Sequence, residues 1–96
     1  MALLFRWNKE KARANLKKHG ISFEEASSAF GDPLSATIDD VDHSKGENRY
    51  ILIGETASRN LVVVSHTERR GEIRIISARL ASRRERRAYE TGQEKT

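Results

Sequence analysis

The sequence predicts an α+β fold with two N-terminal helices, an antiparallel sheet of about four strands and a C-terminal helix. Helix caps and helical spacing occur near the two ends of the chain, whereas residues 34–78 contain apolar runs with the spacing of strands. No helix-length segment separates the last three runs, which excludes the crossovers of a doubly wound parallel sheet. Since 96 residues provide room for one hydrophobic core, we expect a single domain over residues 1–96.

The start of the chain carries the signals for a strand and a helix. The apolar residues 3–5 predict a short first strand. Asn8 is a favoured N-cap residue for a strongly basic helix over about 9–19. Gly20 stands where a left-handed residue is expected after the helix, because glycine adopts positive φ without steric cost.

A second, shorter helix and the first long strand follow. Ser22 and Glu25 have the spacing of a capping box, which opens a helix that Gly31-Asp32-Pro33 ends. Beyond this point the apolar period changes to two, and residues 34–38 predict a half-buried strand. Residues 39–46 then form an acidic loop.

The second half of the chain predicts three strands and a helix. Its apolar runs are rich in Ile and Val and are separated by turn residues, which is typical of an antiparallel meander. They cover Tyr50–Ile53, Leu61–Thr67 and Ile73–Ala78. Ser82 and Glu85 form another capping box, which opens a final helix over about 83–91. We expect a frayed tail over about 91–96.

The composition limits the possible chemistry. The chain is 36% hydrophobic and 33% charged, and it contains no cysteine, which excludes disulfides, thiolate metal sites and a cysteine nucleophile. None of the six glycines completes a dinucleotide-binding or P-loop motif. The apolar N-terminus is five residues long and no segment reaches membrane-spanning length, so we expect a cytoplasmic protein without a membrane partner.

The net charge of +4 conceals three regions of alternating sign. Residues 1–20 carry a net charge of +5, residues 21–48 carry −6 and residues 49–96 carry +5. Twelve of the 18 basic residues are arginine, whose planar guanidinium suits phosphate. This distribution favours nucleic-acid contact, although the arginines of the last helix also fit a solvated surface with intrahelical ion pairs.

Several short strings stand in a specific order between residues 7 and 89. They are Trp7-Asn8-x-x-Lys11-Ala12-x-x-Asn15-Leu16-x-Lys18-His19-Gly20-Ile21-x-Phe23-Glu24-Glu25-Ala26, Phe30-x-Asp32-Pro33, Glu47-x-Arg49-Tyr50-x-x-Ile53-Gly54, Val64-x-His66-Thr67-Glu68-Arg69, and Arg74-Ile75-Ile76-Ser77-Ala78-Arg79 followed by Ala81-Ser82-x-x-Glu85-Arg86-x-x-Tyr89. In order and spacing, the sequence resembles the BrnT family, the toxin half of a bacterial type II toxin–antitoxin pair.

The resemblance implies a RelE-like fold and a metal-independent endoribonuclease that cleaves RNA, including ribosome-associated mRNA, and halts translation. It also implies neutralisation by a BrnA-type antitoxin that represses their shared operon, so operator DNA is bound only through the antitoxin complex. The residues themselves leave a second class open, a non-catalytic basic module that binds nucleic acid or protein.

Metal-free RNA cleavage needs a base for the 2′-hydroxyl, an acid for the leaving 5′-oxygen and cations for the phosphorane. His66 suits proton transfer because histidine exchanges protons near neutral pH. Glu68 lies two residues further and shares a strand face with His66, where it would orient His66 or act as base. The structural alternatives are a hydrogen-bonded edge histidine and an ordinary hairpin-turn acid.

The position of the arginines depends on hairpin register. If Thr67 pairs with Glu72, His66 and Arg79 share a face but lie about six residues, roughly 20 Å, apart along the strand. A register shifted by one residue instead brings Arg74 diagonally near His66. We predict the catalytic residues His66, Glu68 and Arg79, and the RNA- or phosphate-binding residues Arg49, Arg74, Arg83 and Lys11.

Two other groups of residues invite a functional interpretation. His19 follows two lysines at a helix C-terminus, where a cation is favoured by the helix dipole, so we expect a structural role. The acidic loop contains Asp39, Asp40, Asp42 and His43, but their spacing fits no EF-hand or zinc pattern. We therefore predict no metal site and no cofactor.

Overall fold

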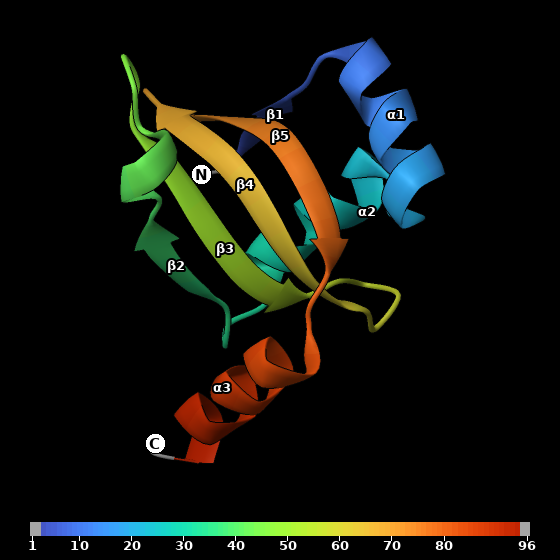
Figure 1. Cartoon of the computed structure of the whole chain (residues 1–96), viewed down its shortest axis with the longest axis vertical. Helices are drawn as coiled ribbons and strands as arrows, with labels where there is room; N and C mark the ends of the chain where they lie inside the picture. The colour runs from blue at the N-terminus through green and yellow to red at the C-terminus, as the bar shows by residue number, and fades with distance from the viewer. Residues whose placement is uncertain (1–2, 95–96) are drawn as a thin grey trace.

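The computed structural model describes residues 3–94, which form one five-stranded sheet and three α-helices (Figure 1). The strands stand in the order β1-β5-β4-β3-β2. Their bounds are β1 Leu4–Arg6, β2 Ala36–Asp39, β3 Arg49–Glu55, β4 Leu61–Arg69 and β5 Glu72–Leu80. The helices are α1 Lys9–His19, α2 Phe23–Ser28 and α3 Arg83–Glu94, with short 3-10 turns at Ala29–Gly31 and Val41–His43.

The predicted α+β class is confirmed, but the sheet is mixed rather than antiparallel. Strand β1 pairs in parallel with β5, with Arg6 opposite Arg74. The other neighbouring strands pair antiparallel. The α1–β4 part of the chain separates β1 from β5, so no local turn signal marks this pairing in the sequence.

The N-terminal helices begin and end as their caps predict. The Asn8 side chain accepts a hydrogen bond from the backbone N–H of Lys11 at 3.0 Å, and Gly20 closes α1 with φ of 73°. The Ser22 hydroxyl accepts from the N–H of Glu25 at 2.9 Å and caps α2. These bonds satisfy backbone donors that a helix leaves free in its first turn.

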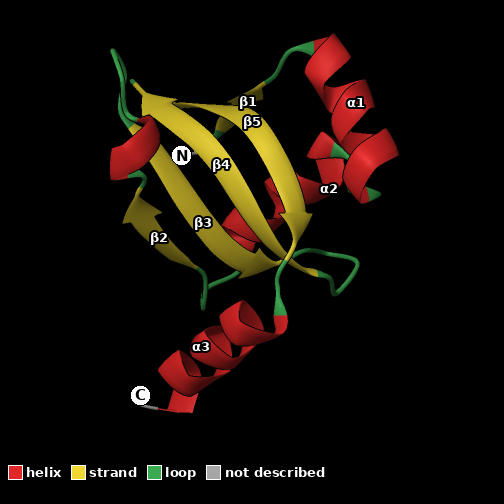
Figure 2. Cartoon of the chain, in the orientation of Figure 1, coloured by secondary structure: helices red, strands yellow, loops and turns green. Residues whose placement is uncertain are grey.

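The hydrophobic core lies between one face of the sheet and the N-terminal helices. Its members come from α2 and its flanks and from the central strands, namely Ile21, Phe23, Ala26, Ala29, Leu52, Val62, Val64, Ile73, Ile75 and Ala78. Asn15 on α1 is also buried and exchanges hydrogen bonds with the backbone of Ala78 on β5. The other sheet face, turned toward the viewer in Figure 2, has no helix across its centre and is called the open face below.

The register of the β4–β5 hairpin differs from both predicted alternatives. Arg69 pairs with Glu72, and Thr67 pairs with Arg74. The connection is a two-residue turn in which Arg70 and Gly71 have φ of 53° and 82°. Positive φ at both central residues matches the right-handed twist of paired strands, which fixes this register. Both predicted registers are wrong because neither contains a two-residue turn at Arg70 and Gly71.

A β-bulge in β5 changes which face of the sheet its following side chains point to. His66 pairs with Ile75, but Ser65 pairs with Ser77, so Ile76 has no partner across the strand. An extra residue of this kind reverses the alternation of side chains beyond it. As a result, Arg74 and Arg79 share the open face although they are five residues apart.

Two outer elements differ from expectation. The strand predicted at residues 34–38 is β2, and its four residues are exposed rather than half-buried, because it forms one edge of the sheet. Helix α3 continues to Glu94, beyond the predicted end near residue 91, since Gly92 costs a helix about 1 kcal/mol but does not forbid it. The remainder of the predicted tail, residues 95–96, lies outside the described residues.

No described helix is long and apolar enough to cross a membrane.

Candidate active site

His66 lies on the core face of β4 and has no exposed surface. Its ring sits between two aromatic rings, with centroid distances of 4.8 Å to Phe30 and 5.8 Å to Tyr50. The strand pairing explains the second contact, because Tyr50 is the partner of His66 on β3. A substrate therefore cannot touch the imidazole directly in this conformation.

Glu68 links the buried ring of His66 to the surface of the molecule. The Nε2 atom of His66 lies 3.0 Å from Oε2 of Glu68, whose side chain is 51% exposed. The Nδ1 atom lies 3.4 Å from the carbonyl oxygen of Val64. Both ring nitrogens thus face oxygen acceptors. The contact with His66 thus orients the Glu68 side chain at the surface.

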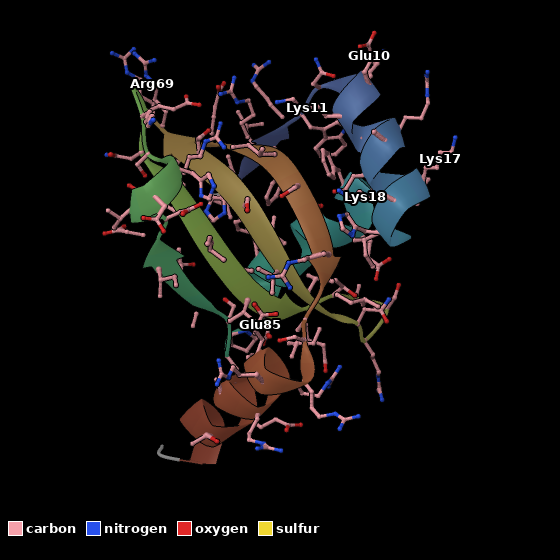
Figure 3. All side chains as sticks on the ribbon, viewed as in Figure 1. Glu10, Lys11, Lys17, Lys18, Arg69 and Glu85 are labelled. Atoms are coloured by element: carbon pink, nitrogen blue, oxygen red, sulfur yellow. The ribbon has the colours of Figure 1, made fainter. Side chains whose placement is uncertain are left out.

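Glu68 opens into a groove of about 580 Å³ at the hairpin end of the sheet. The charged residues that line this groove come from four segments and include both signs, namely Arg6, Glu47, Glu68, Arg69, Glu72 and Arg74. Thr67 also lines the groove and is 9% exposed. Figure 3 shows Arg69 at the tip of the hairpin. The groove lining therefore combines Glu68 with three arginines, although the Glu68 side chain lies on the core face with His66, whereas Arg74 lies on the open face.

A smaller pocket of about 160 Å³ adjoins this groove and is called the anion pocket. Its basic residues are Lys11 from α1, Arg49 from β3 and Arg74 from β5, and no acidic residue lines it. Ile76, the bulged residue, forms part of its wall. Arg74 lines both cavities, so the anion pocket and the Glu68 groove are neighbours. Three cations suit a phosphate group, and one of them, Arg74, is bonded to the carboxylate of Glu47 outside the pocket lining.

The ion pairs of this region are exposed. Arg74 bonds to Glu47 at 2.8 Å, and Arg6 bonds to Glu72 at 3.0 Å. Side chains in these pairs are between 42% and 67% exposed, and exposed pairs contribute only about 0–1 kcal/mol. The carboxylate at Arg74 can therefore be exchanged for another anion at little cost in free energy.

Arg79 is bound differently, at the far end of the sheet. Its guanidinium donates to both carboxylate oxygens of Glu85 at 2.8 and 2.9 Å. Glu85 also accepts from the N–H of Ser82, whose hydroxyl caps α3 in return, so the predicted capping box is present. The hydrogen bond from Arg79 lowers the pKa of Glu85 to about 2, against an opposing effect of burial. Arg79 therefore anchors α3 to the sheet.

A second anchor holds the middle of α3. The hydroxyl of Tyr89 donates to Asp32 at 2.5 Å, and Asp32 also accepts from the N–H groups of Leu34 and Glu55. Burial raises the pKa of Asp32, but the bonds from Tyr89 and the two backbone groups outweigh it and lower the pKa overall.

The structure brings together some of the predicted site residues and separates others. His66 and Glu68 are in contact, and Lys11, Arg49 and Arg74 line one pocket. Arg79 pairs with Val63, three residues or about 10 Å along β4 from His66, and points to the opposite face. Arg83 is exposed at the start of α3, at the same end as Arg79. His66 and Arg79 thus do not share one site.

Most residues that line the groove were not among the predicted site residues, including Arg6, Glu47, Thr67, Arg69 and Glu72. Arg6 reaches the groove through the parallel pairing of β1, which has no local signal. Glu47 and Thr67 stood in the resembling strings without an assigned role, and only the tertiary structure places them beside Arg74.

The acidic loop and His19 are the two remaining groups considered in the sequence. His43 contacts Asp40 at 3.0 Å within the acidic loop. Within residues 3–94, no three His, Asp or Glu side chains are placed to hold a metal ion. His19 ends α1 beside Lys17 and Lys18, which project from the lower part of that helix in Figure 3.

Comparison with known proteins identifies relatives of this chain. A family model described as the ribonuclease toxin BrnT of type II toxin–antitoxin systems matches residues 7–85. The fold is similar to the crystal structure of the Brucella abortus ribonuclease toxin BrnT, with a TM-score of 0.64 and 21% sequence identity over 85% of this chain and 100% of that chain. No curated protein matches the sequence.

Proposed function

The chain belongs to the BrnT family of ribonuclease toxins of type II toxin–antitoxin systems, and we propose on this basis that it is a metal-independent endoribonuclease. The observation that carries the proposal is the hairpin end of the sheet, where Glu68, bonded to buried His66, and three arginines line one groove next to the anion pocket. We therefore assign proton transfer and phosphate binding to neighbouring residues at the hairpin end of the sheet.

In the proposed reaction, Glu68 is the general base. Its Oε2 atom accepts from His66, and its Oε1 atom has no hydrogen bond among the described residues, which leaves that oxygen for substrate. Glu68 takes the proton of a ribose 2′-hydroxyl, and the 2′-oxygen attacks the adjacent phosphorus. The P–O5′ bond breaks, the 5′-oxygen takes up a proton from solvent water, and the products carry a 2′,3′-cyclic phosphate and a 5′-hydroxyl.

The cations hold the phosphate that reacts and the phosphate next to it. Arg74 lines both the Glu68 groove and the anion pocket, and we assign to its guanidinium the stabilisation of charge on the phosphorane. Lys11 and Arg49 bind a neighbouring phosphate in the anion pocket and fix the strand relative to Glu68. These three residues are thus the proposed RNA-binding set.

His66 acts through Glu68 rather than on the RNA, because its ring is fully buried. We assign it as a positioning residue that keeps Glu68 oriented. Arg79 and Arg83 lie at the α3 end, so their part in activity is to support α3 and to form a separate basic surface. This assignment replaces the direct catalytic roles that the sequence suggested for His66 and Arg79.

The finer biological role follows from the family. RNA cleavage would halt translation in the cytoplasm, a BrnA-type antitoxin would neutralise the toxin, and the pair would bind operator DNA through the antitoxin. The competing role is a non-catalytic basic module. It is favoured by the burial of His66 and by the ion pairs that occupy Arg6 and Arg74.

One assay separates these two roles. Purified protein freed of any partner is incubated with RNA in excess EDTA, with and without ribosomes, and the fragment ends are identified. We expect fragments that end in 2′,3′-cyclic phosphate. RNA that stays intact under both conditions would overturn the enzymatic role and leave the binding module.

The role of His66 is tested with His66→Phe, which retains a ring between Phe30 and Tyr50 but removes the bond to Glu68. We expect a cleavage rate at neutral pH reduced at least tenfold and a displaced acidic limb of the pH–rate profile, with a melting temperature near that of wild type. A purely structural role would alter the melting temperature and leave the pH profile in place. Phe30→Leu serves as the packing control.

A further inference from the structure

The open face of the sheet carries an apolar groove that the proposed reaction does not use. It has a volume of about 260 Å³, and its lining residues are Ala36, Ile38, Ile51, Ile53 and Val63 from the sheet with Glu85, Ala88 and Tyr89 from α3. Ile38 is 63% exposed on the edge strand. Contiguous aliphatic side chains from three strands on an uncovered face are typical of a protein-binding surface.

The surroundings of the groove indicate the chemistry of its occupant. Arg79 lies on the same face, in register with Val63 and Ile53. Helix α3 contributes Arg83, Arg84, Arg86 and Arg87, all exposed, on the sides that do not line the groove. An apolar floor with a basic rim is complementary to a segment that is apolar on one face and acidic on its other sides. Aliphatic residues offer nothing to the phosphates of RNA, so these observations favour a protein.

The groove also adjoins the proposed RNA site. Ile51 on its floor lies two residues after Arg49 of the anion pocket on the same face of β3, a separation of about 7 Å. A segment that lies along β3 and β4 therefore reaches from the apolar groove to Arg49 and Arg74. Binding of this kind would exclude RNA from the cations without any change in the fold.

We propose that this groove, with its arginine rim, is the docking surface of the antitoxin, which inserts an acidic amphipathic segment and thereby covers the anion pocket. The proposal rests on the proposed function, because it takes the antitoxin of the type II pair as the partner.

The absence of cysteine allows a direct test. Ile38→Cys and Leu16→Cys each place one thiol at a similarly exposed apolar position, since Leu16 is 50% exposed on α1. The thiols are labelled with a maleimide in free toxin, in the complex with the antitoxin co-expressed from the same operon, and with a non-cleavable 2′-deoxy RNA analogue. We expect the antitoxin to slow labelling at position 38 at least tenfold and to leave position 16 unchanged.

Ile38→Glu and Leu16→Glu complete the test by affinity. We expect Ile38→Glu to weaken antitoxin binding at least tenfold and Leu16→Glu to change it less than twofold. Unprotected labelling of Ile38→Cys with wild-type affinity for Ile38→Glu would overturn the proposal, as would protection by the RNA analogue alone. The RNA-cleavage assay of the wild-type toxin is independent: if RNA stays intact but the antitoxin protects the thiol of Ile38→Cys, the enzymatic role fails and the docking surface stands.

Discussion

The two ends of the sheet are both rich in arginine, yet they hold these residues in different ways. At the α3 end, Arg79 is locked by two hydrogen bonds to Glu85, which also caps the helix. At the hairpin end, Arg49 and Lys11 line a pocket without acids, and the partners of Arg74 and Arg6 are exposed carboxylates. The number of arginines therefore identifies a basic region of the sequence. Whether a given guanidinium is structural or available to a ligand depends on its hydrogen-bond partner.

The largest expected difference between the two ends concerns their carboxylates. Glu68→Gln removes the proposed base without changing the shape of the side chain, so we expect the RNA-cleavage rate to fall about 10²–10⁴-fold. Glu85→Gln at the α3 end should leave the rate within about threefold. Both are measured on a labelled RNA at saturating toxin. Equal losses in the two variants would remove the functional distinction between the ends.

A smaller contrast is expected for the cations in RNA binding. Arg49→Ala and Lys11→Ala should each weaken binding of a single-stranded RNA about tenfold, because a bond to a charged group is lost. Each should also reduce the slope of log K against log salt by about 0.7. Arg87→Ala, on an exposed position of α3, is the matched control and should change neither quantity appreciably. Fluorescence anisotropy at several salt concentrations provides both values.

At the α3 end, we expect an effect of pH on thermal stability rather than an effect of substitution on RNA cleavage. The pKa of Glu85 is lowered from 4.5 to about 2 by Arg79, so its stabilising bond is fully present above about pH 4.5 and is lost as pH falls toward 2. We expect the melting temperature of the wild type to fall more steeply across this window than that of Glu85→Gln. Thermal unfolding followed by circular dichroism measures this difference. Parallel curves would show that the Arg79–Glu85 bond does not stabilise the protein.

The smallest effect is expected at Gly92 within α3. A Cβ added there meets no atom within 4 Å, and alanine stabilises a helix by about 1 kcal/mol relative to glycine. We expect Gly92→Ala to slow amide hydrogen exchange in α3 and to leave exchange at the hairpin end unchanged. A uniform slowing across the sheet would contradict the separate behaviour of the two ends.

The site residues were predictable only in part. His66 and Glu68 are neighbours because a strand repeats every two residues, a local rule that the sequence displays. The burial of His66 was not predictable, since it depends on Phe30 and Tyr50, which come from distant segments. Arg6 and Glu47 reach the groove through long-range pairing and an ion pair, for which no local signal exists.

Features that depend on neighbouring residues could be predicted from the sequence alone. Asn8, Gly20 and Ser22 mark the ends of their helices because a cap is a contact between residues a few positions apart. The same holds for the α+β class, which follows from the periods of apolar residues.

The side chains that meet across the sheet, by contrast, were set by the tertiary structure. A one-residue change of register moves every side chain to the other face, and the apolar pattern of β5 was compatible with more than one register. Here the two-residue turn at Arg70 and Gly71 sets the register, and the bulge at Ile76 places Arg79 on the face that Arg74 also occupies. The separation of His66 from Arg79 follows from that geometry, because pairing between strands brings together residues that are distant in the chain.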